Sequence, residues 1–179
     1  MRKQIIISGL GGQGIILAGN ILCYSSMKED KYVTLVPSYG AEMRGGTANC
    51  QIIISDEYIG SPIVKDIDIL LSFNKPSYDR FSSKVSKNGI IFANSSLYKP
   101  NSIADVGIVE IPGNELAAEC GSILTLNMVM LGALVAKTKI IAKETLLNAI
   151  PEILTKRKEK FWEINKKALE TGFDFVGEK

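Results

Sequence analysis

The sequence predicts an α/β fold, doubly wound around a mostly parallel sheet with an added hairpin. Three observations lead to this prediction. Short apolar segments alternate with longer segments of helical period, as in successive βα units. The first apolar segment is nearly continuous, as in a strand covered on both faces. The 179 residues are 46% hydrophobic and 22% charged, a balance typical of an ordinary globular chain. We expect residues 1–179 to form one domain.

The first unit consists of a strand, a tight turn and a helix. Residues 4–8 are mostly apolar and form the expected strand, residues 9–14 the turn, and residues 13–27 the helix. Residues 32–36 form a second strand, which we expect to stop at Pro37 because proline cannot donate to a ladder. This order is the start of a parallel α/β sheet.

A hairpin is expected in the next segment. Residues 48–54 alternate loosely between polar and apolar side chains, as in a strand. A turn at residues 55–57 then leads to a return segment at residues 58–62.

The remaining chain predicts further alternation. The expected elements are strands at 67–73, 90–93 and 107–111, and helices opening near 75 and spanning 113–120, 122–136, 143–150 and 158–171. The charge-free stretch 120–136 is near the short limit for a membrane span, but Ser122, Thr125 and Asn127 favour a helix buried in a core or interface. The tail after Gly172 is expected to be loosely held.

Composition excludes several classes of function. The net charge of +2 argues against a nucleic-acid binder, and no segment predicts a membrane span or a targeting signal. The chain has no histidine, which removes the commonest general base and metal ligand. Its three cysteines, Cys23, Cys50 and Cys120, lack metal-site spacing and indicate reduced, buried thiols in a cytoplasmic protein. We therefore expect no catalytic residue and no metal site in this chain.

The turn carries a Gly-x-Gly-x-x-Gly motif between a strand and a helix, which is the Rossmann-like context for phosphate binding. Its candidate binding residues are Gly9, Gly11, Gly12, Gln13 and Gly14. A dinucleotide site would also need an acidic residue after the second strand, where Val36, Pro37 and Ser38 stand instead. Three interpretations stay open: a dinucleotide site, a site for another anion, and a structural turn or subunit contact.

A second polar, glycine-rich loop spans residues 38–49. It offers stacking, carboxylate, guanidinium and amide groups on a backbone that glycines allow to approach a ligand or another chain. Its candidate contact residues are Tyr39, Glu42, Arg44, Gly45, Gly46 and Asn49. The alternative is that Glu42 and Arg44 pair with each other in an ordinary surface loop.

Together the two loops resemble a known family. Gly-Leu-Gly-Gly-Gln-Gly-x-x-x-Ala-Gly at 9–19, Pro-Ser-Tyr-Gly-Ala-Glu-Met-Arg-Gly-Gly-Thr-Ala-Asn-Cys at 37–50 and Gly-Ser-Pro at 60–62 resemble the gamma subunit of 2-oxoacid:ferredoxin oxidoreductases. The form of the second motif is similar to the 2-oxoglutarate branch or the branched-chain 2-oxoacid branch. The resemblance covers essentially the whole chain.

This resemblance implies a CoA-dependent oxidative decarboxylation, in which 2-oxoacid, CoA and oxidised ferredoxin give acyl-CoA, carbon dioxide and reduced ferredoxin. It implies that alpha, beta and, where present, delta subunits hold the thiamine diphosphate, Mg and iron–sulfur clusters. This chain would bind none of these alone. Its loop 38–49 would contact the other subunits or help form the CoA channel, with Arg44 holding a CoA phosphate or a partner carboxylate and Glu42 ordering Arg44.

Two other classes of function stay open beside this one. The chain could be a stand-alone nucleotide-binding oxidoreductase that uses the turn at 9–14, or an interaction module without a ligand.

Overall fold

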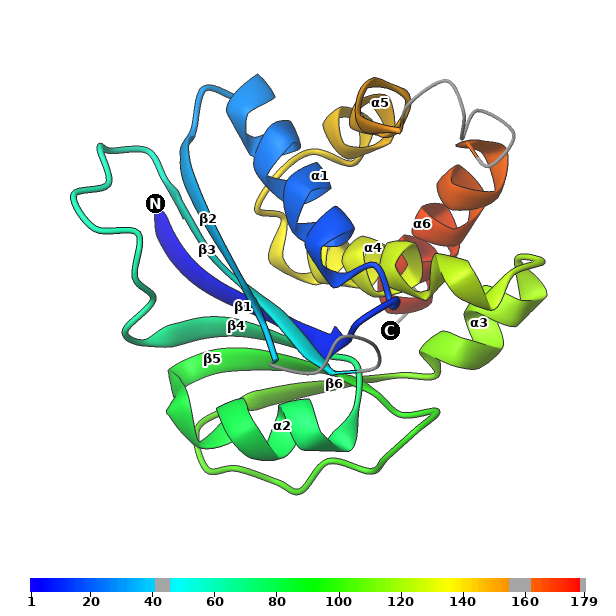
Figure 1. Ribbon diagram of the computed structural model, residues 1–179, viewed down its shortest axis with the longest axis horizontal. Coiled ribbons are helices and arrows are strands. Elements are labelled where there is room, and N and C mark those ends of the chain that lie inside the picture. The colour runs from blue at the N-terminus through cyan, green and yellow to red at the C-terminus, as the bar shows by residue number, and fades with distance from the viewer. Residues whose placement is uncertain (41–45, 155–161, 178–179) are drawn as a thin grey trace.

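The computed structural model describes residues 1–40, 46–154 and 162–177, and it shows a six-stranded sheet with helices on both faces (Figure 1). The predicted α/β class is confirmed. The strands are β1 Arg2–Leu10, β2 Tyr32–Tyr39, β3 Thr47–Ser55, β4 Ile67–Ser72, β5 Val85–Asn94 and β6 Gly107–Ile111. The helices are α1 Ile15–Lys28, α2 Lys75–Phe81, α3 Gly113–Glu119, α4 Leu126–Thr138, α5 Lys143–Ile153 and α6 Trp162–Gly177, with short 3₁₀ turns η1 Ser82–Lys84 and η2 Ile123–Thr125.

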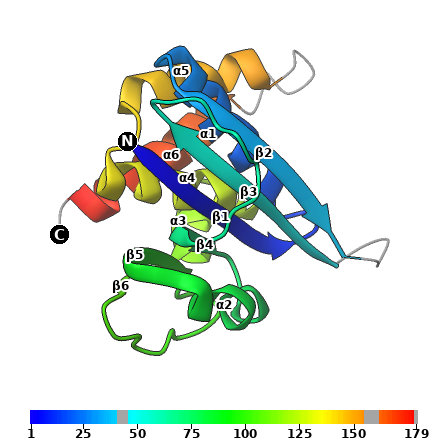
Figure 2. The same cartoon turned by 90° about the vertical axis from the view of Figure 1, so that its left-hand side faces the viewer.

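The strand order in the sheet is β2-β3-β1-β4-β5-β6 (Figure 2). The pairs β1–β4, β4–β5 and β5–β6 are parallel, whereas β3 is antiparallel to both of its neighbours, β1 and β2. The central strand β1 is covered on both faces, which explains its apolar run Ile5, Ile6 and Ile7.

The hairpin exists, but its predicted position was wrong. β3 pairs with β2 through the segment between Tyr39 and Thr47, and the residues at 58–62 form no strand. Pro37 also does not end β2, which runs to Tyr39 with Pro37 opposite Cys50. Proline is tolerated there because β2 is an edge strand, so the missing N–H is not needed by a further neighbour.

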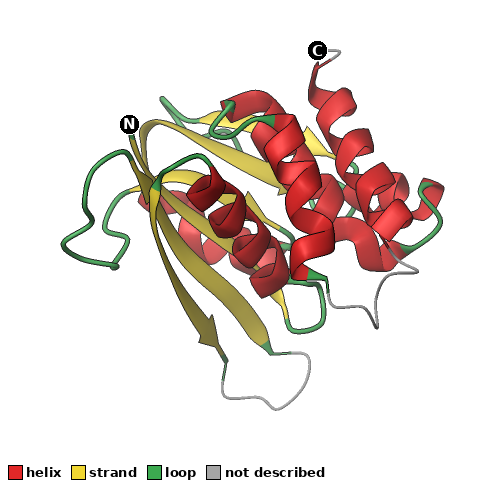
Figure 3. Ribbon diagram, turned by 90° about the horizontal axis from the view of Figure 1, so that it is seen from above, coloured by secondary structure: helices red, strands yellow, loops and turns green. Residues whose placement is uncertain are grey.

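The two faces of the sheet are covered unequally. Among the described helices, α1, α3, α4, α5 and α6 contribute to the core on one face, and only α2 covers the other (Figure 1; the helices are red in Figure 3). Every residue of α4 from Leu126 to Val135 is buried, so the expectation of a buried helix in the charge-free stretch is confirmed. Among the described helices, none combines the length and apolar character that crossing a bilayer requires.

The last helix corrects the predicted tail. Beyond Gly172, α6 continues to Gly177, and Phe173, Phe175 and Val176 pack partly buried against the main core. Three large apolar residues in four positions give this segment enough surface to bury, which offsets the entropy of ordering it. Ala168 and Leu169 of the same helix are fully buried.

Candidate functional site

The four parallel strands β1, β4, β5 and β6 end at a common edge of the sheet, which is where open α/β sheets bind ligands. Polar side chains are buried where three of these strands end or just beyond, at Ser8, Ser72, Asn74 and Asn94. The glycine turn follows β1 at the same edge. The candidate site is therefore this carboxyl edge with its two flanking loops.

The turn is closed by its own residues. The Gln13 side chain accepts a hydrogen bond from the Leu10 N–H at 2.7 Å, and the Gln13 N–H donates back to the Leu10 carbonyl at 3.2 Å. Gly9 packs so tightly that an added Cβ would lie 2.9 Å from Phe73 Cβ. Gly12 and Gly14 have φ of +95° and +73°, a conformation that favours glycine.

The structure brings the two sequence motifs into contact. The Gly11 N–H donates to the Gly46 carbonyl at 2.8 Å, so the residue directly before β3 is bonded to the glycine turn. Tyr39 ends β2 with 67% of its surface exposed, and Asn49 is buried in β3 between Ser8 and Ser38. The predicted contact residues Glu42, Arg44 and Gly45 lie outside the described residues.

Sheet order also bears on the dinucleotide interpretation. In a dinucleotide fold the acidic residue that binds ribose ends the strand beside β1. Here β3 separates β1 from β2, so the end of β2 lies two strand spacings, about 10 Å, from β1. The residue at that end is Ser38 or Tyr39, and neither carries a carboxylate. This arrangement disfavours a dinucleotide at the turn.

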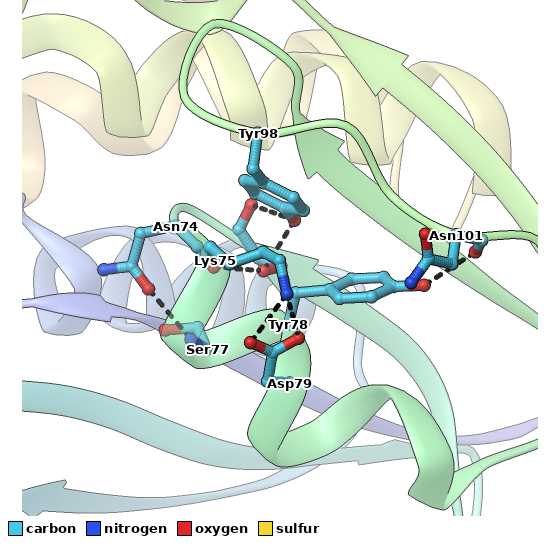
Figure 4. A network of polar contacts seen from close by, with 8 residues as sticks. Asn74, Lys75, Ser77, Tyr78, Asp79, Tyr98 and Asn101 are labelled. Atoms are coloured by element: carbon cyan, nitrogen blue, oxygen red, sulfur yellow. Dashed lines mark hydrogen bonds and ion pairs between the residues drawn. The ribbon is translucent and has the colours of Figure 1, made fainter.

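Sequence reasoning missed a polar network beyond β4 (Figure 4). The Asn74 Oδ1 accepts the Ser77 N–H at 2.9 Å and so caps α2, while the Ser77 hydroxyl bonds that of Ser8 at 3.0 Å. The Tyr98 hydroxyl donates to Ser72 Oγ at 2.8 Å, and burial raises the pKa of Tyr98. These contacts fix how α2 leaves the sheet.

A second asparagine organises the end of β5. Asn94 is fully buried and donates to the Phe73 carbonyl at 3.1 Å, while its Oδ1 accepts the Gly113 N–H at 3.2 Å. Nearby, the Ser96 hydroxyl bonds Glu115 and lowers the pKa of that carboxyl. The signal available in the sequence was an asparagine directly after, or at the end of, an apolar strand.

Two of the three thiols are unsuited to bind metal. All three cysteines are free and buried, as predicted. Burial raises the pKa of Cys23 and of Cys50 from 9.0 to about 12, so neither offers the thiolate that a cluster or zinc ion needs. Across the described residues, no group of three or more Cys, Asp or Glu side chains is placed to hold a metal ion.

Comparison with known proteins identifies the family. The family model described as pyruvate ferredoxin/flavodoxin oxidoreductase matches residues 4–175. The 2-oxoglutarate synthase subunit KorC of Methanocaldococcus jannaschii is 36% identical over 99% of this chain and 96% of its own length. The ketoisovalerate oxidoreductase subunit VorA of Methanothermobacter marburgensis is 34% identical over 97% of this chain, which spans only 36% of VorA.

Solved structures give the same result. The gamma subunit of a keto/oxoacid ferredoxin oxidoreductase from Geobacter sulfurreducens matches with a TM-score of 0.87 and 30% identity, over 98% of this chain and 97% of that one. A 2-oxoglutarate:ferredoxin oxidoreductase from Magnetococcus marinus, solved with 2-oxoglutarate, coenzyme A and succinyl-CoA, matches with a TM-score of 0.90 and 25% identity. The match spans 99% of this chain and 31% of that one.

The chain belongs to the pyruvate ferredoxin/flavodoxin oxidoreductase family. Its fold and extent are those of the gamma subunit of a 2-oxoacid:ferredoxin oxidoreductase, so it is a subunit of an oxidoreductase. The predicted resemblance is confirmed.

Proposed function

We propose that this chain, acting as one gamma domain over residues 1–179, serves a CoA-acylating 2-oxoglutarate:ferredoxin oxidoreductase. The observation that carries the proposal is the match to KorC, which extends over nearly the full length of both chains. The VorA match supports a branched-chain 2-oxoacid such as ketoisovalerate as the second candidate substrate.

The chain's role in this proposal is structural. Alpha, beta and, where present, delta subunits would hold thiamine diphosphate, Mg and the iron–sulfur clusters and pass electrons to ferredoxin. Two properties of this chain support that division of labour. It contains no histidine, and the two thiols of Cys23 and Cys50 are held neutral by burial. We propose that it binds none of these cofactors alone.

The contact with the other subunits, or with CoA, is proposed for the segment at residues 38–49. Tyr39 is the exposed group at its start, and Gly46 anchors its end on Gly11. Arg44 would hold a CoA phosphate or a partner carboxylate, with Glu42 ordering its guanidinium. Tyr39 and Arg44 are among the residue types that recur at the energetic centres of protein interfaces.

Reconstitution tests the function. The alpha and beta subunits are assembled with and without this chain, and ferredoxin reduction is followed with CoA and either 2-oxoglutarate or ketoisovalerate. We expect CoA-dependent reduction only with the chain present, and a higher kcat/KM for 2-oxoglutarate. A higher kcat/KM for ketoisovalerate would make ketoisovalerate the preferred substrate in place of 2-oxoglutarate. Equal rates of ferredoxin reduction without the chain would refute its role as a required subunit.

The proposed contact is tested by Arg44→Ala, with Arg80→Ala as the matched control, because Arg80 is an exposed residue of helix α2. We expect Arg44→Ala to weaken assembly or to raise the KM for CoA about tenfold, as for loss of a charged hydrogen bond. Unchanged assembly together with an unchanged KM would exclude both roles for Arg44.

A further inference from the structure

The two edge strands of the sheet are protected against further pairing to different degrees. β6 at one edge has only five residues and carries Glu110, and both features oppose the addition of another strand. β2 at the other edge has eight residues and no charged side chain (Figure 2). Its one protective feature is Pro37. β2 is therefore the edge at which this sheet can be extended.

The backbone groups of β2 alternate in direction. The Gly40 N–H donates to the Thr47 carbonyl at 2.7 Å, which makes Gly40 and Thr47 a hydrogen-bonded pair just beyond the end of the strand. By the observed register, even-numbered residues of β2 therefore bond β3, and odd-numbered residues direct their N–H and carbonyl groups away from it. Pro37 fits this alternation, because a residue without an N–H is tolerated at an outward position.

The outward groups form a ladder that has no partner. Val33, Leu35 and Tyr39 each present an N–H and a carbonyl, and Pro37 presents a carbonyl alone. Within residues 1–40, 46–154 and 162–177, no turn, loop or cap hydrogen bond involves these groups. The side chains of Val33 and Leu35 pack against the main core, so these two residues offer only their backbone. An edge of this kind accepts an extended peptide as an added strand.

Exposed tyrosines stand at both ends of the edge. Tyr32 begins β2 with 51% of its surface exposed, and its ring meets that of Tyr58 edge-on, with centroids 6.3 Å apart. Tyr58 is 80% exposed, and Tyr39 at the other end of β2 is 67% exposed. Tyrosine is enriched at the energetic centres of protein interfaces. The backbone ladder would supply affinity for an added strand, and the rings at its ends would supply specificity.

Pro37 argues against a second copy of this chain as the added strand. In the symmetric antiparallel pairing that uses all four outward residues, Pro37 of each copy lies opposite Leu35 of the other. The missing N–H then leaves the Leu35 carbonyl of both copies unpaired. A segment from a different chain meets Pro37 only once, so it loses one hydrogen bond where the second copy loses two.

The relatives indicate a source for the added strand. The match to KorC spans 96% of KorC, whereas the matches to VorA and to the Magnetococcus oxidoreductase span 36% and 31% of longer chains. In those two proteins the domain shares one polypeptide with a larger region, which is therefore held beside it. The subunit that corresponds to this larger region of VorA is called the partner subunit below.

We propose that β2 accepts an added strand from the partner subunit, through the outward backbone groups of Val33, Leu35 and Tyr39. The proposal rests on the proposed function only for the identity of the complex. It assigns a contact to β2 itself and uses no residue between 41 and 45.

Hydrogen exchange at single amides tests the added strand. In the isolated full chain, the outward amides at 33, 35 and 39 should exchange at least about tenfold faster than the even-numbered amides of β2, which bond β3. Assembly with the partner subunit should slow the outward amides by about tenfold or more and leave the even-numbered amides nearly unchanged. A contact made only by side chains would not give this alternation.

Three results of the exchange measurement would overturn the proposal. The first is unchanged exchange of the outward amides in the assembled complex. The second is equal slowing of both sets, because that indicates a general stabilisation of β2. The third is slow exchange of the outward amides in the isolated chain that slows further as its concentration rises, because a second copy would then be the occupant.

Two substitutions at Tyr39 separate the backbone donor from the ring. Tyr39→Pro removes the outward N–H and the ring, whereas Tyr39→Ala removes the ring alone. We expect Tyr39→Pro to bind the partner subunit about fivefold more weakly than Tyr39→Ala, as for loss of one hydrogen bond. Isothermal titration calorimetry measures both affinities, and equal affinities would overturn the proposal. If thermal unfolding shows that Tyr39→Pro is not folded, the exchange measurement on the wild-type chain decides the question.

The reconstituted complex separates this proposal from the proposed function. CoA-dependent ferredoxin reduction that requires the chain, with unchanged exchange of the outward amides, would overturn the added strand and leave the proposed function standing. Alternating protection of β2 without CoA-dependent reduction of ferredoxin would support the added strand and refute the proposed function.

Discussion

Glycine serves opposite purposes in two regions of this molecule. Where α4 crosses α6, Gly132 and Gly172 let the two backbones touch. A Cβ added at Gly132 would lie 2.0 Å from the Leu169 carbonyl oxygen, and one added at Gly172 would lie 1.9 Å from the Val129 carbonyl oxygen. In the turn after β1, Gly12 has nothing within 4 Å and is required instead by its φ of +95°. The helix crossing needs glycine for space, and the turn needs it for conformation. At Gly12 the conspicuous motif is thus tolerant in packing terms, whereas at Gly9 an added Cβ would lie 2.9 Å from Phe73 Cβ.

The helix crossing should give the largest effect of substitution. Gly132→Ala and Gly172→Ala each place a methyl group against backbone atoms that cannot move aside, so we expect a loss of about 3 kcal/mol or more of the free energy of unfolding. Urea denaturation measures it. Gly177→Ala is the control, because Gly177 has open space around it and should change stability little. A loss below that of the control would remove the contrast between the regions.

Within the turn, Gly14→Ala and Gly12→Ala divide the two requirements. Both residues have positive φ, so each variant should lose about 1–2 kcal/mol through backbone strain. Gly14→Ala should lose about 1 kcal/mol more, because its Cβ would meet the Asn127 Nδ2 that donates to the Gly14 carbonyl at 3.2 Å. The same denaturation assay ranks them. Equal losses of the free energy of unfolding in the two variants would mean that the Asn127 side chain moves aside without an energetic cost.

The thiols of Cys23 and Cys50 report whether the core beneath α1, α4, α5 and α6 is accessible to solvent. Because burial raises the pKa of Cys23 and Cys50 from 9.0 to about 12, the folded chain binds more protons than the unfolded chain between these values. The two thiols should therefore leave stability unaffected below pH 9 and reduce it as pH rises from 9 to 12. We also expect an aromatic disulfide reagent to label these cysteines only after unfolding. Rapid labelling of the native chain would show that this face opens.

The smallest effect is expected from substitution of Asp56, which lies after β3 at the edge of the sheet where β1 begins. Hydrogen bonds from Lys31 and from the N-terminus lower the pKa of Asp56 to about 2. Its ionised form therefore stabilises the fold above its unfolded pKa, and that contribution is lost as pH falls toward 2. Because these groups are exposed, Asp56→Asn should cost little at neutral pH and less in high salt. A loss comparable to that of Gly14→Ala would contradict this ranking.

Much of the fold was predictable from local pattern. Apolar runs located β1, β4 and β6, the charge-free stretch located α4, and Pro76 located the start of α2. These features depend on neighbours in sequence, which a periodicity records directly. The hairpin was misplaced because a local pattern does not show which segment pairs with a given strand. Residues 58–62 were predicted to pair with β3, whereas residues 32–39 pair with it in the structure.

The sequence by itself determined the α/β class, the two glycine-rich loops and, through their combination, the family. Only the tertiary structure decided that β3 lies between β1 and β2, that the Gly11 N–H bonds the Gly46 carbonyl, and that Phe73 packs against Gly9. Sheet order brings Gly9 and Phe73 together across some 60 positions of chain, and no local pattern encodes that contact. The physical reason is that strand order is set by the burial of all layers at once, whereas each strand and helix is set by its own residues.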